Sequence, residues 1–409
     1  MIASALVRKT ALPGRWCAIG LSIALVYLLG VAWLPERVYL SVFQCAVLAL
    51  LGVWLLLVGA GRLRFRFHPV VAAAWALPLW GAVQLACGTS VYRQPTALAI
   101  LDWTVVAGVA TLSFQLASTS QFRQPFRTGL IGTALVVTAF SLLHWYTSPG
   151  LLLWWKPNPY ILRSPFPLLN HTHFAALVEL AIALVAWEAL ESRTPFRFHS
   201  WAAGLMMGAV FAVGARSGSA IVAVELVILA VRHLAMNRTV DRRMRALTVL
   251  LPAFALVLAI GWQGLAGRAK SAPRDDLRPL FTQSTLDMIR ARPLAGFGLG
   301  NWATAYPAFA RVDPDAFVEH AHDDWLEWAA EGGIPFLIIM LGVATWAVRR
   351  GWSNPQWLGI AAIFIQALFE FPLHKPVILV FQFAALGCLA ASRSTTAVEV
   401  IGTRTIDAK

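Results

Sequence analysis

Long apolar runs alternate with short polar breaks along almost the whole chain. An apolar helix needs about 20 residues to cross a bilayer, so the runs predict transmembrane helices. Several runs are short, and the seventh and the last two could instead be tilted or re-entrant. The twelve candidates are Trp16–Leu34, Val38–Ala60, Val70–Gly88, Ala97–Ser118, Gly129–Thr147, Thr172–Leu190, Trp201–Gly214, Ala220–Leu234, Leu247–Gly267, Ile334–Val348, Trp357–Phe371 and Val377–Ala391.

One long hydrophilic connection separates the ninth and tenth runs. The pattern therefore predicts an all-α membrane protein of about 12 transmembrane helices with a single long, partly helical loop. Three regions follow: residues 1–266 with spans 1–9, residues 267–333 as the loop, and residues 334–409 with spans 10–12 and a tail. Long connections in compact proteins are usually functional or disordered.

Composition agrees with this pattern. The 409 residues are 58% hydrophobic and 13% charged, which is too little polar surface for a soluble core of this length. The net charge of +13 does not indicate nucleic acid, because Lys and Arg fall in short clusters between apolar runs. The four cysteines form no CxxC pair, so neither a zinc site nor a disulfide framework is indicated. The basic, then apolar N-terminus lacks a small-x-small cleavage site and is interpreted as a retained first span.

The distribution of Lys and Arg predicts the orientation. Alternate connections starting from the N-terminus hold 20 of these residues in seven short segments. The other connections hold 13, and 7 of those lie in the long loop, where the charge rule is weak. Both termini are therefore expected in the cytoplasm, with the long loop on the periplasmic face.

The long loop contains recognisable local structure. The stretch RPLFTQSTLDMIRARP has apolar residues at helical spacing and stops at Pro293. The following GFGLGN is typical of a turn, because its GxGxG lacks the strand before and the helix after that a nucleotide site requires. No cofactor is predicted from it.

A second helix is predicted in VEHAHDDWLEWAAEGGIPF, ending at Gly332 and Gly333. His322 is expected in its first turn, where the positive helix terminus keeps imidazole neutral and able to accept a proton. The alternative is a surface helix whose His and acidic residues only face water. A metal site from His320, His322 and Asp324 is disfavoured, because HxH on a helix points the two rings apart.

Two other segments reach the same membrane face. In RSPFPLLNHTHF the prolines keep the chain extended until Asn170 caps the next helix, which places Arg163, Asn170 and His173 at the surface. Capping alone would also explain Asn170. In GARSGSA, Arg216 lies in a break between two apolar runs, and an Arg near membrane depth usually has an anionic partner. An interfacial anchor is the alternative for Arg216.

These segments, in this order, resemble the O-antigen ligase and polymerase superfamily. RSPFPLLNHTHF matches its Arg-, Asn- and His-bearing start of a middle span, and GARSG matches its small-residue break with an Arg. Arg278, Pro293 and GFGLGN match the family's loop, and His322, Asp323 and Gly333 match its end. The resemblance covers roughly residues 163–336. Two residues depart from the ligase pattern. It commonly has Asn, Ser or Gln after the His, where this chain has Asp323, and a small residue or Tyr three positions after the Gly, where this chain has Phe336.

The resemblance implies an enzyme of the bacterial inner membrane. It implies metal-independent, inverting transfer of a glycan from undecaprenyl diphosphate to an acceptor hydroxyl, such as a lipid A-core sugar, in the periplasm, with no cofactor. Arg216 and Arg278 would bind the diphosphate, and His322 would take the acceptor proton. The residues implied in substrate binding are Arg163, Asn170, His173 and Asp323. Polymerisation of glycan units, protein O-glycosylation and, in a different class, small-anion (inorganic carbon) transport stay open.

Overall fold

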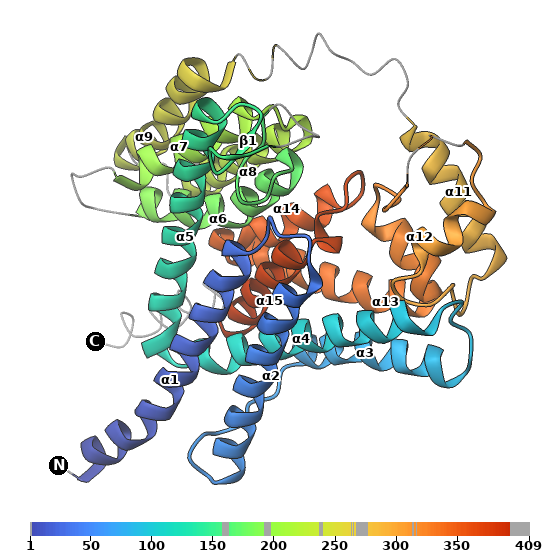
Figure 1. Ribbon diagram of the computed structural model, residues 1–409. Coiled ribbons are helices and arrows are strands. Elements are labelled where there is room, and N and C mark those ends of the chain that lie inside the picture. The colour runs from blue at the N-terminus through green and yellow to red at the C-terminus, as the bar shows by residue number, and fades with distance from the viewer. Residues whose placement is uncertain are drawn as a thin grey trace.

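The computed structural model describes residues 2–157, 163–191, 198–236, 240–262, 264, 266, 277–312, 315 and 317–392 (Figure 1). Helices dominate the described chain. Two paired antiparallel strands, β1 (Leu151–Leu152) and β2 (Lys156–Pro157), have two residues each. The all-α prediction is confirmed.

The helices that precede the loop are α1 (Ile2–Gly30), α2 (Arg37–Gly59), α3 (Pro69–Ala86), α4 (Arg93–Ala117), α5 (Ser120–Thr147), α6 (His171–Glu191), α7 (Phe198–Ala212), α8 (Arg216–Met236) and α9 (Val240–Leu256), which continues as the π-helical turn η1 (Val257–Gly261). The loop and the last region contain α11 (Arg278–Ala291), α12 (Trp302–Ala305), α13 (Asp324–Ser353), α14 (Leu358–Gln366) and α15 (Pro376–Ala391). Short 3₁₀ turns are η2 (Tyr306–Ala308), η3 (Pro355–Trp357) and η4 (Pro372–His374).

Each of the twelve predicted spans overlaps helical structure. Within the described residues, eight helices are long and apolar enough to cross a membrane, and three more apolar helices are shorter. The run Trp357–Phe371 contains α14, which has nine residues. At 1.5 Å per residue α14 covers about 14 Å, roughly half of a bilayer core. The protein is a multi-pass membrane protein, but the count of twelve spans is not confirmed.

Helix α6 is the centre of the bundle. Of its most apolar window, 89% is buried inside the protein, so this helix contacts other helices and hardly any lipid. It packs against α5, α7, α8 and α14. A second group forms around α4, which packs closely with α3 and α15 (Figure 1).

The described part of the loop folds onto the membrane helices. Helices α11 and α12 lie beside the first half of α13 and the end of α3, apart from α6 to α9 (Figure 1). They enclose a small apolar core, whose buried members include Phe281, Met288, Phe297, Trp302 and Tyr306. The predicted helix after Arg278 and the turn after Pro293 are both confirmed.

Buried hydrogen bonds fix the glycine turn to α3 and α4. The Gln84 amide on α3 donates to the carbonyls of Ala295 and Glu331, and its oxygen accepts from Leu299 N–H. Asn301 donates to Thr96 at 2.8 Å. Gly298 has a φ of +98°, and a Cβ there would lie 2.3 Å from Ser90 Oγ. The turn therefore needs glycine both for its conformation and for its close approach to the α3–α4 connection.

Helix α13 is kinked where the sequence predicted that a helix would end. Gly333 has non-helical dihedrals, φ 66° and ψ −173°, and Pro335 lacks an N–H for the next turn. The N–H of Ile334 donates instead to Pro293 O at 2.8 Å. The first half of α13 thus lies against the loop, and the second half continues as an apolar span.

Gly333→Ala should destabilise the protein. A Cβ at this position would lie 2.3 Å from Leu294 O, and the backbone conformation is one that other residues rarely adopt. We expect a loss of about 2 kcal/mol or more, seen as a lower unfolding temperature of the protein in detergent. Gly342→Ala on the same helix is the control, because nothing lies within 4 Å of its added Cβ. Equal unfolding temperatures for the two variants would contradict this account.

Candidate functional site

Four residues that the sequence analysis singled out lie at the N-termini of helices, either as the first residue or directly before it. Arg216 is the first residue of α8, and Arg278 is the first residue of α11. Asn170 directly precedes α6, and Asp323 directly precedes α13. The N-terminus of a helix carries unpaired N–H groups and a partial positive charge, so helix starts of this kind favour a bound anion.

His322 lies before α13, and the prediction that it belongs to the first turn is wrong. Helix α13 begins at Asp324, and the Asp323 carboxylate caps it by accepting from Leu326 N–H at 3.0 Å. His322 has a φ of +59°, which is uncommon for a residue other than glycine. This conformation turns the His322 ring out of the line of the helix and toward α11 and the α14–α15 connection.

Asp323 is explained by its capping role. An Asn, which is common in the ligase pattern at this position, would accept the same hydrogen bond. Burial raises the pKa of Asp323 to about 6, against the opposing hydrogen bonds from Leu326 and Trp325. The departure from the family pattern therefore keeps the local structure and adds a titratable group beside His322.

Glu370 joins His322 to Arg278. The Glu370 side chain is buried, and its Oε1 accepts from the Arg278 guanidinium at 3.0 Å. Its Oε2 lies 3.9 Å from His322 Nδ1. Two residues that are 44 positions apart in sequence thus meet at one carboxylate, which comes from the segment after α14.

Aromatic rings fix the plane of the His322 ring. Phe281 of α11 stacks on it at a centroid distance of 6.1 Å, and Phe371 meets it edge-on at 4.8 Å. Phe371 also contacts the rings of His173 at 5.1 Å and His320 at 4.5 Å. The first turn of α6 and the residues before α13 therefore share one aromatic partner.

The α6 segment has the predicted local structure. Asn170 Oδ1 accepts from the Thr172 N–H at 2.8 Å, so it caps α6 as expected. Arg163 is exposed as expected, but His173 is buried, so the expectation that its side chain lies at the surface is wrong: it packs against the Phe371 ring. Helix α8 starts beside this end of α6, because a Cβ on Gly218 would lie 2.2 Å from the Ala175 side chain. Arg216 is exposed at that start, directly after the break at Gly214 and Ala215.

Three carboxylates lie in a row on the buried face of α13. Asp324 accepts from Leu373 N–H at 2.9 Å, and Glu331 accepts from Trp302 N–H at 2.9 Å. Glu327 accepts from Ala321 N–H at 2.8 Å and contacts His320 Nδ1 at 2.9 Å. The positions follow a helical i, i+3, i+7 spacing, and each carboxylate fixes a different segment of the site.

His374 lies between two of these carboxylates. Its Nδ1 bonds to Asp324, and its Nε2 lies 3.4 Å from Glu327 Oε1. Burial lowers the pKa of His374, but the carboxylates of Glu327 and Asp324 outweigh it and raise the pKa to about 10. Burial, with the nearby His374 and Lys375, lowers the pKa of His320 to about 2.

The residues that offer metal ligands differ from those weighed in the sequence. His320, Glu327 and His374 each place one ligand atom within 4.8 Å of the others. The other two residues considered from sequence lie apart from this group: Asp324 binds His374 Nδ1, and His322 Nδ1 lies 3.9 Å from Glu370 Oε2.

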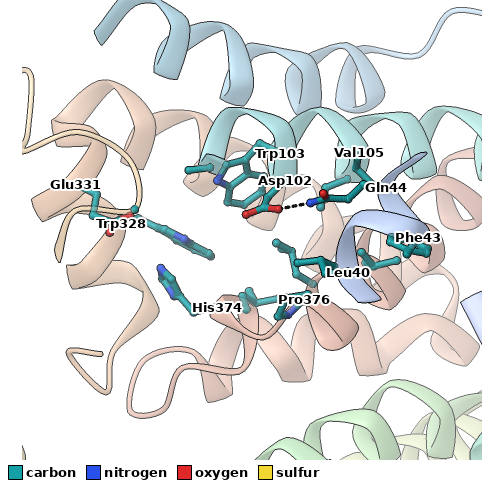
Figure 2. Close-up of a pocket in the computed structure, with 16 residues that line it drawn as sticks. Leu40, Phe43, Gln44, Asp102, Trp103, Val105, Trp328, Glu331, His374 and Pro376 are labelled. Atoms are coloured by element: carbon teal, nitrogen blue, oxygen red, sulfur yellow. Dashed lines mark hydrogen bonds between the residues drawn. The ribbon is translucent and has the colours of Figure 1, made fainter. Parts of the chain in front are cut away.

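A pocket of about 140 Å³ borders the same residues (Figure 2). Glu331, Trp328 and His374 form one end, as Figure 2 shows, and the side chains of α2, α4 and α15 form the apolar remainder. Asp102 of α4 also lines the pocket, next to Trp103, and accepts a hydrogen bond from Gln44. One end of the carboxylate row of α13, at Glu331, therefore borders this pocket.

Sequence reasoning missed Glu370, Phe371 and His374. They belong to the segment FEFPLHKP, which overlaps the end of the run Trp357–Phe371 that was interpreted as a span. An acidic residue at the end of an apolar run and a histidine just after it were the available signal, but nothing in the sequence pairs that segment with a loop about 50 residues earlier.

Asp323→Asn should change how stability depends on pH. Because burial raises the pKa of Asp323 to about 6, ionising its carboxyl costs more in the folded protein than in the unfolded chain. The free energy of unfolding of the native protein should therefore decrease as pH rises from about 4 to about 6 and Asp323 ionises. The variant keeps the cap but does not titrate, so we expect near-equal unfolding midpoints at pH 4 and a higher midpoint for the variant at pH 7. Tryptophan fluorescence in detergent measures this, and parallel pH profiles would contradict it.

Comparison with known families agrees with the geometry. Residues 201–341, about a third of the chain, match the family model described as O-antigen ligase. The match includes Arg216, Arg278, His322 and Asp323, and it confirms the resemblance to the O-antigen ligase superfamily. No curated protein shows a significant match to the chain.

Proposed function

We propose that this protein is a glycosyltransferase of the O-antigen ligase type that moves a glycan from undecaprenyl diphosphate to an acceptor hydroxyl. The observation that carries the proposal is the meeting of Arg278 and His322 at Glu370, within the region that matches the ligase family. The acceptor class is a sugar hydroxyl such as that of lipid A-core. Polymerisation and protein O-glycosylation use the same chemistry with a different acceptor.

Arginines at helix starts suit a diphosphate leaving group. The guanidinium offers a planar fork of donors that matches phosphate oxygens, and the N-termini of α8 and α11 add partial positive charge beside Arg216 and Arg278. Arg278 is held by Glu370 in this structure, so a diphosphate would share or replace that carboxylate. Neutralising the developing charge in this way needs no metal ion.

His322 is placed to act as the base. Glu370 lies near Nδ1, so the opposite ring nitrogen, Nε2, is the proton acceptor in our proposal. The acceptor oxygen attacks the anomeric carbon, the bond from that carbon to the diphosphate oxygen breaks, and the acceptor proton passes to Nε2. The Glu370 carboxylate stabilises the imidazolium that forms, as carboxylates do beside other catalytic histidines. A single displacement of this kind inverts the anomeric carbon.

The orientation inferred from the Lys and Arg distribution completes the proposal. It places the site at the periplasmic face of the inner membrane and both chain ends in the cytoplasm. The connection that carries Glu370 and the segment that carries His322 must then lie on the same side, and their contact agrees with this. Reporter fusions after Trp302 should be active only with periplasmic reporters.

His322→Ala should abolish most of the transfer activity. General-base help contributes about a hundred- to ten-thousand-fold, so the rate should fall by that factor while the amount of protein in the membrane stays the same. The assay follows labelled glycan from a lipid-linked donor to acceptor in proteoliposomes. Glu370→Gln should reduce the rate less, because it leaves the base in place. Normal transfer by His322→Ala would remove this residue from the mechanism.

Lysine should replace Arg278 or Arg216 poorly. A lysine keeps the charge but loses the two-pronged contact, at a cost of about 1.5–3 kcal/mol, or roughly ten- to a hundredfold in rate. Arg290→Lys is the matched control, because Arg290 is exposed on α11 and pairs with Asp287 on the same helix. Full activity of Arg216→Lys would support the interfacial-anchor interpretation of that residue.

The acceptor and the competing transport function need their own experiments. In a deletion strain, unmodified core in the lipopolysaccharide banding indicates a ligase, and core with one unit indicates a polymerase. Normal banding indicates another acceptor. Uptake of a small anion such as bicarbonate by proteoliposomes, without glycan transfer, would instead favour a transporter.

A further inference from the structure

We propose that His320, Glu327 and His374 bind a divalent transition-metal ion of the zinc class. The ion would link the segment before α13 to the connection between α14 and α15. This site is separate from the proposed transfer chemistry, in which His322 and the arginines act.

The ligand atoms are close to the arrangement that zinc needs. Zinc binds His nitrogen and carboxylate oxygen at about 2.0–2.2 Å in a tetrahedron, which puts neighbouring ligand atoms about 3.3–3.6 Å apart. Glu327 Oε1 lies 2.9 Å from His320 Nδ1 and 3.4 Å from His374 Nε2. All three atoms lie within 4.8 Å of one another, so a shift of about 1 Å completes three corners.

Each of the two best-buried ligands is held by a further partner. The Asp324 carboxylate binds Nδ1 of His374, which leaves Nε2 facing Glu327. Asp324 is itself fixed by Leu373 N–H, and the second oxygen of Glu327 accepts from Ala321 N–H. A histidine whose other nitrogen is bound to a buried carboxylate is the usual arrangement around zinc, because the carboxylate orients the ring and makes it a better ligand.

The charges around the cluster favour a cation. Asp324, Glu327 and Glu331 are buried on one face of α13, and buried carboxylates need positive partners. Lys375 lies on the other side of His320, 3.4 Å from Nε2, where it also contacts Glu319. A divalent ion held by His320, Glu327 and His374 would supply such a partner.

The ion has a defined structural consequence. Its ligands come from the segment before α13, from α13 itself and from η4. His374 also lines the 140 Å³ pocket, which has room for a water molecule as the fourth ligand. His322 lies two residues after one ligand, and Glu370 lies four residues before another. Binding of the ion would therefore hold Glu370 and His322 in register.

Metal binding by purified full-length protein tests the proposal. The chelator-stripped protein in detergent is titrated with zinc by calorimetry and with cobalt by visible absorption. We expect one tight equivalent of zinc, the absorption of tetrahedral cobalt, and an unfolding temperature that rises with zinc. The double variant His320→Ala with His374→Ala should lose all three signals. Asp324→Asn should bind about 10- to 100-fold more weakly, because it removes only the support of His374.

His322→Ala is the control that separates this proposal from the proposed function. It should bind zinc like the native protein, even if its transfer activity is lost. Should the double variant fail to fold, Asp324→Asn and Glu327→Gln still report on the site through their zinc affinity. Equal zinc binding by the native protein and these variants, or no binding by the native protein, would show that the cluster is only an imidazolium–carboxylate network.

Discussion

The buried face of α13 carries the interaction on which the site depends. Asp324, Glu327 and Glu331 accept backbone N–H groups from three separate segments, at Leu373, Ala321 and Trp302. Buried carboxylates without such partners would be strongly unfavourable, so the three contacts fix the segments together as a set. One helix face thereby organises the loop, the residues before α13 and the α14–α15 connection, and the positions of His322 and Glu370 follow from it.

The kink at Gly333 lets α13 serve two environments. Its first half lies among polar loop segments, and its second half is apolar enough to form part of a span. Gln84 and Trp80 of α3 bind the carbonyls of Glu331 and Gly332, so the kink is also held from the membrane side. Polar chemistry is thereby placed at the end of an apolar bundle without leaving the buried backbone groups at the kink unpaired.

The sequence predicted the helices and the local structure at several candidate residues, but not how the segments of the candidate site come together. Apolar runs located the helices. The helix that begins at Arg278, the glycine turn and the Asn170 cap are local patterns, and the structure has each of them as predicted. His322 was misplaced because the helix was predicted to include VEHAH, whereas the Asp323 cap and the φ of +59° at His322 make it begin at Asp324. Glu370 and His374 were missed because their partners lie 47 to 92 residues away in the chain. Helix α14 has only nine residues within the run Trp357–Phe371, so the prediction of a full span there is not confirmed.

The central claim is that arginine binds the lipid diphosphate while His322 acts only in the chemical step. The most direct measurement is the affinity of purified protein for undecaprenyl diphosphate, compared among the native protein, Arg278→Ala and His322→Ala. The account predicts at least about tenfold weaker binding for Arg278→Ala and near-native binding for His322→Ala. Native affinity in the arginine variant would contradict it.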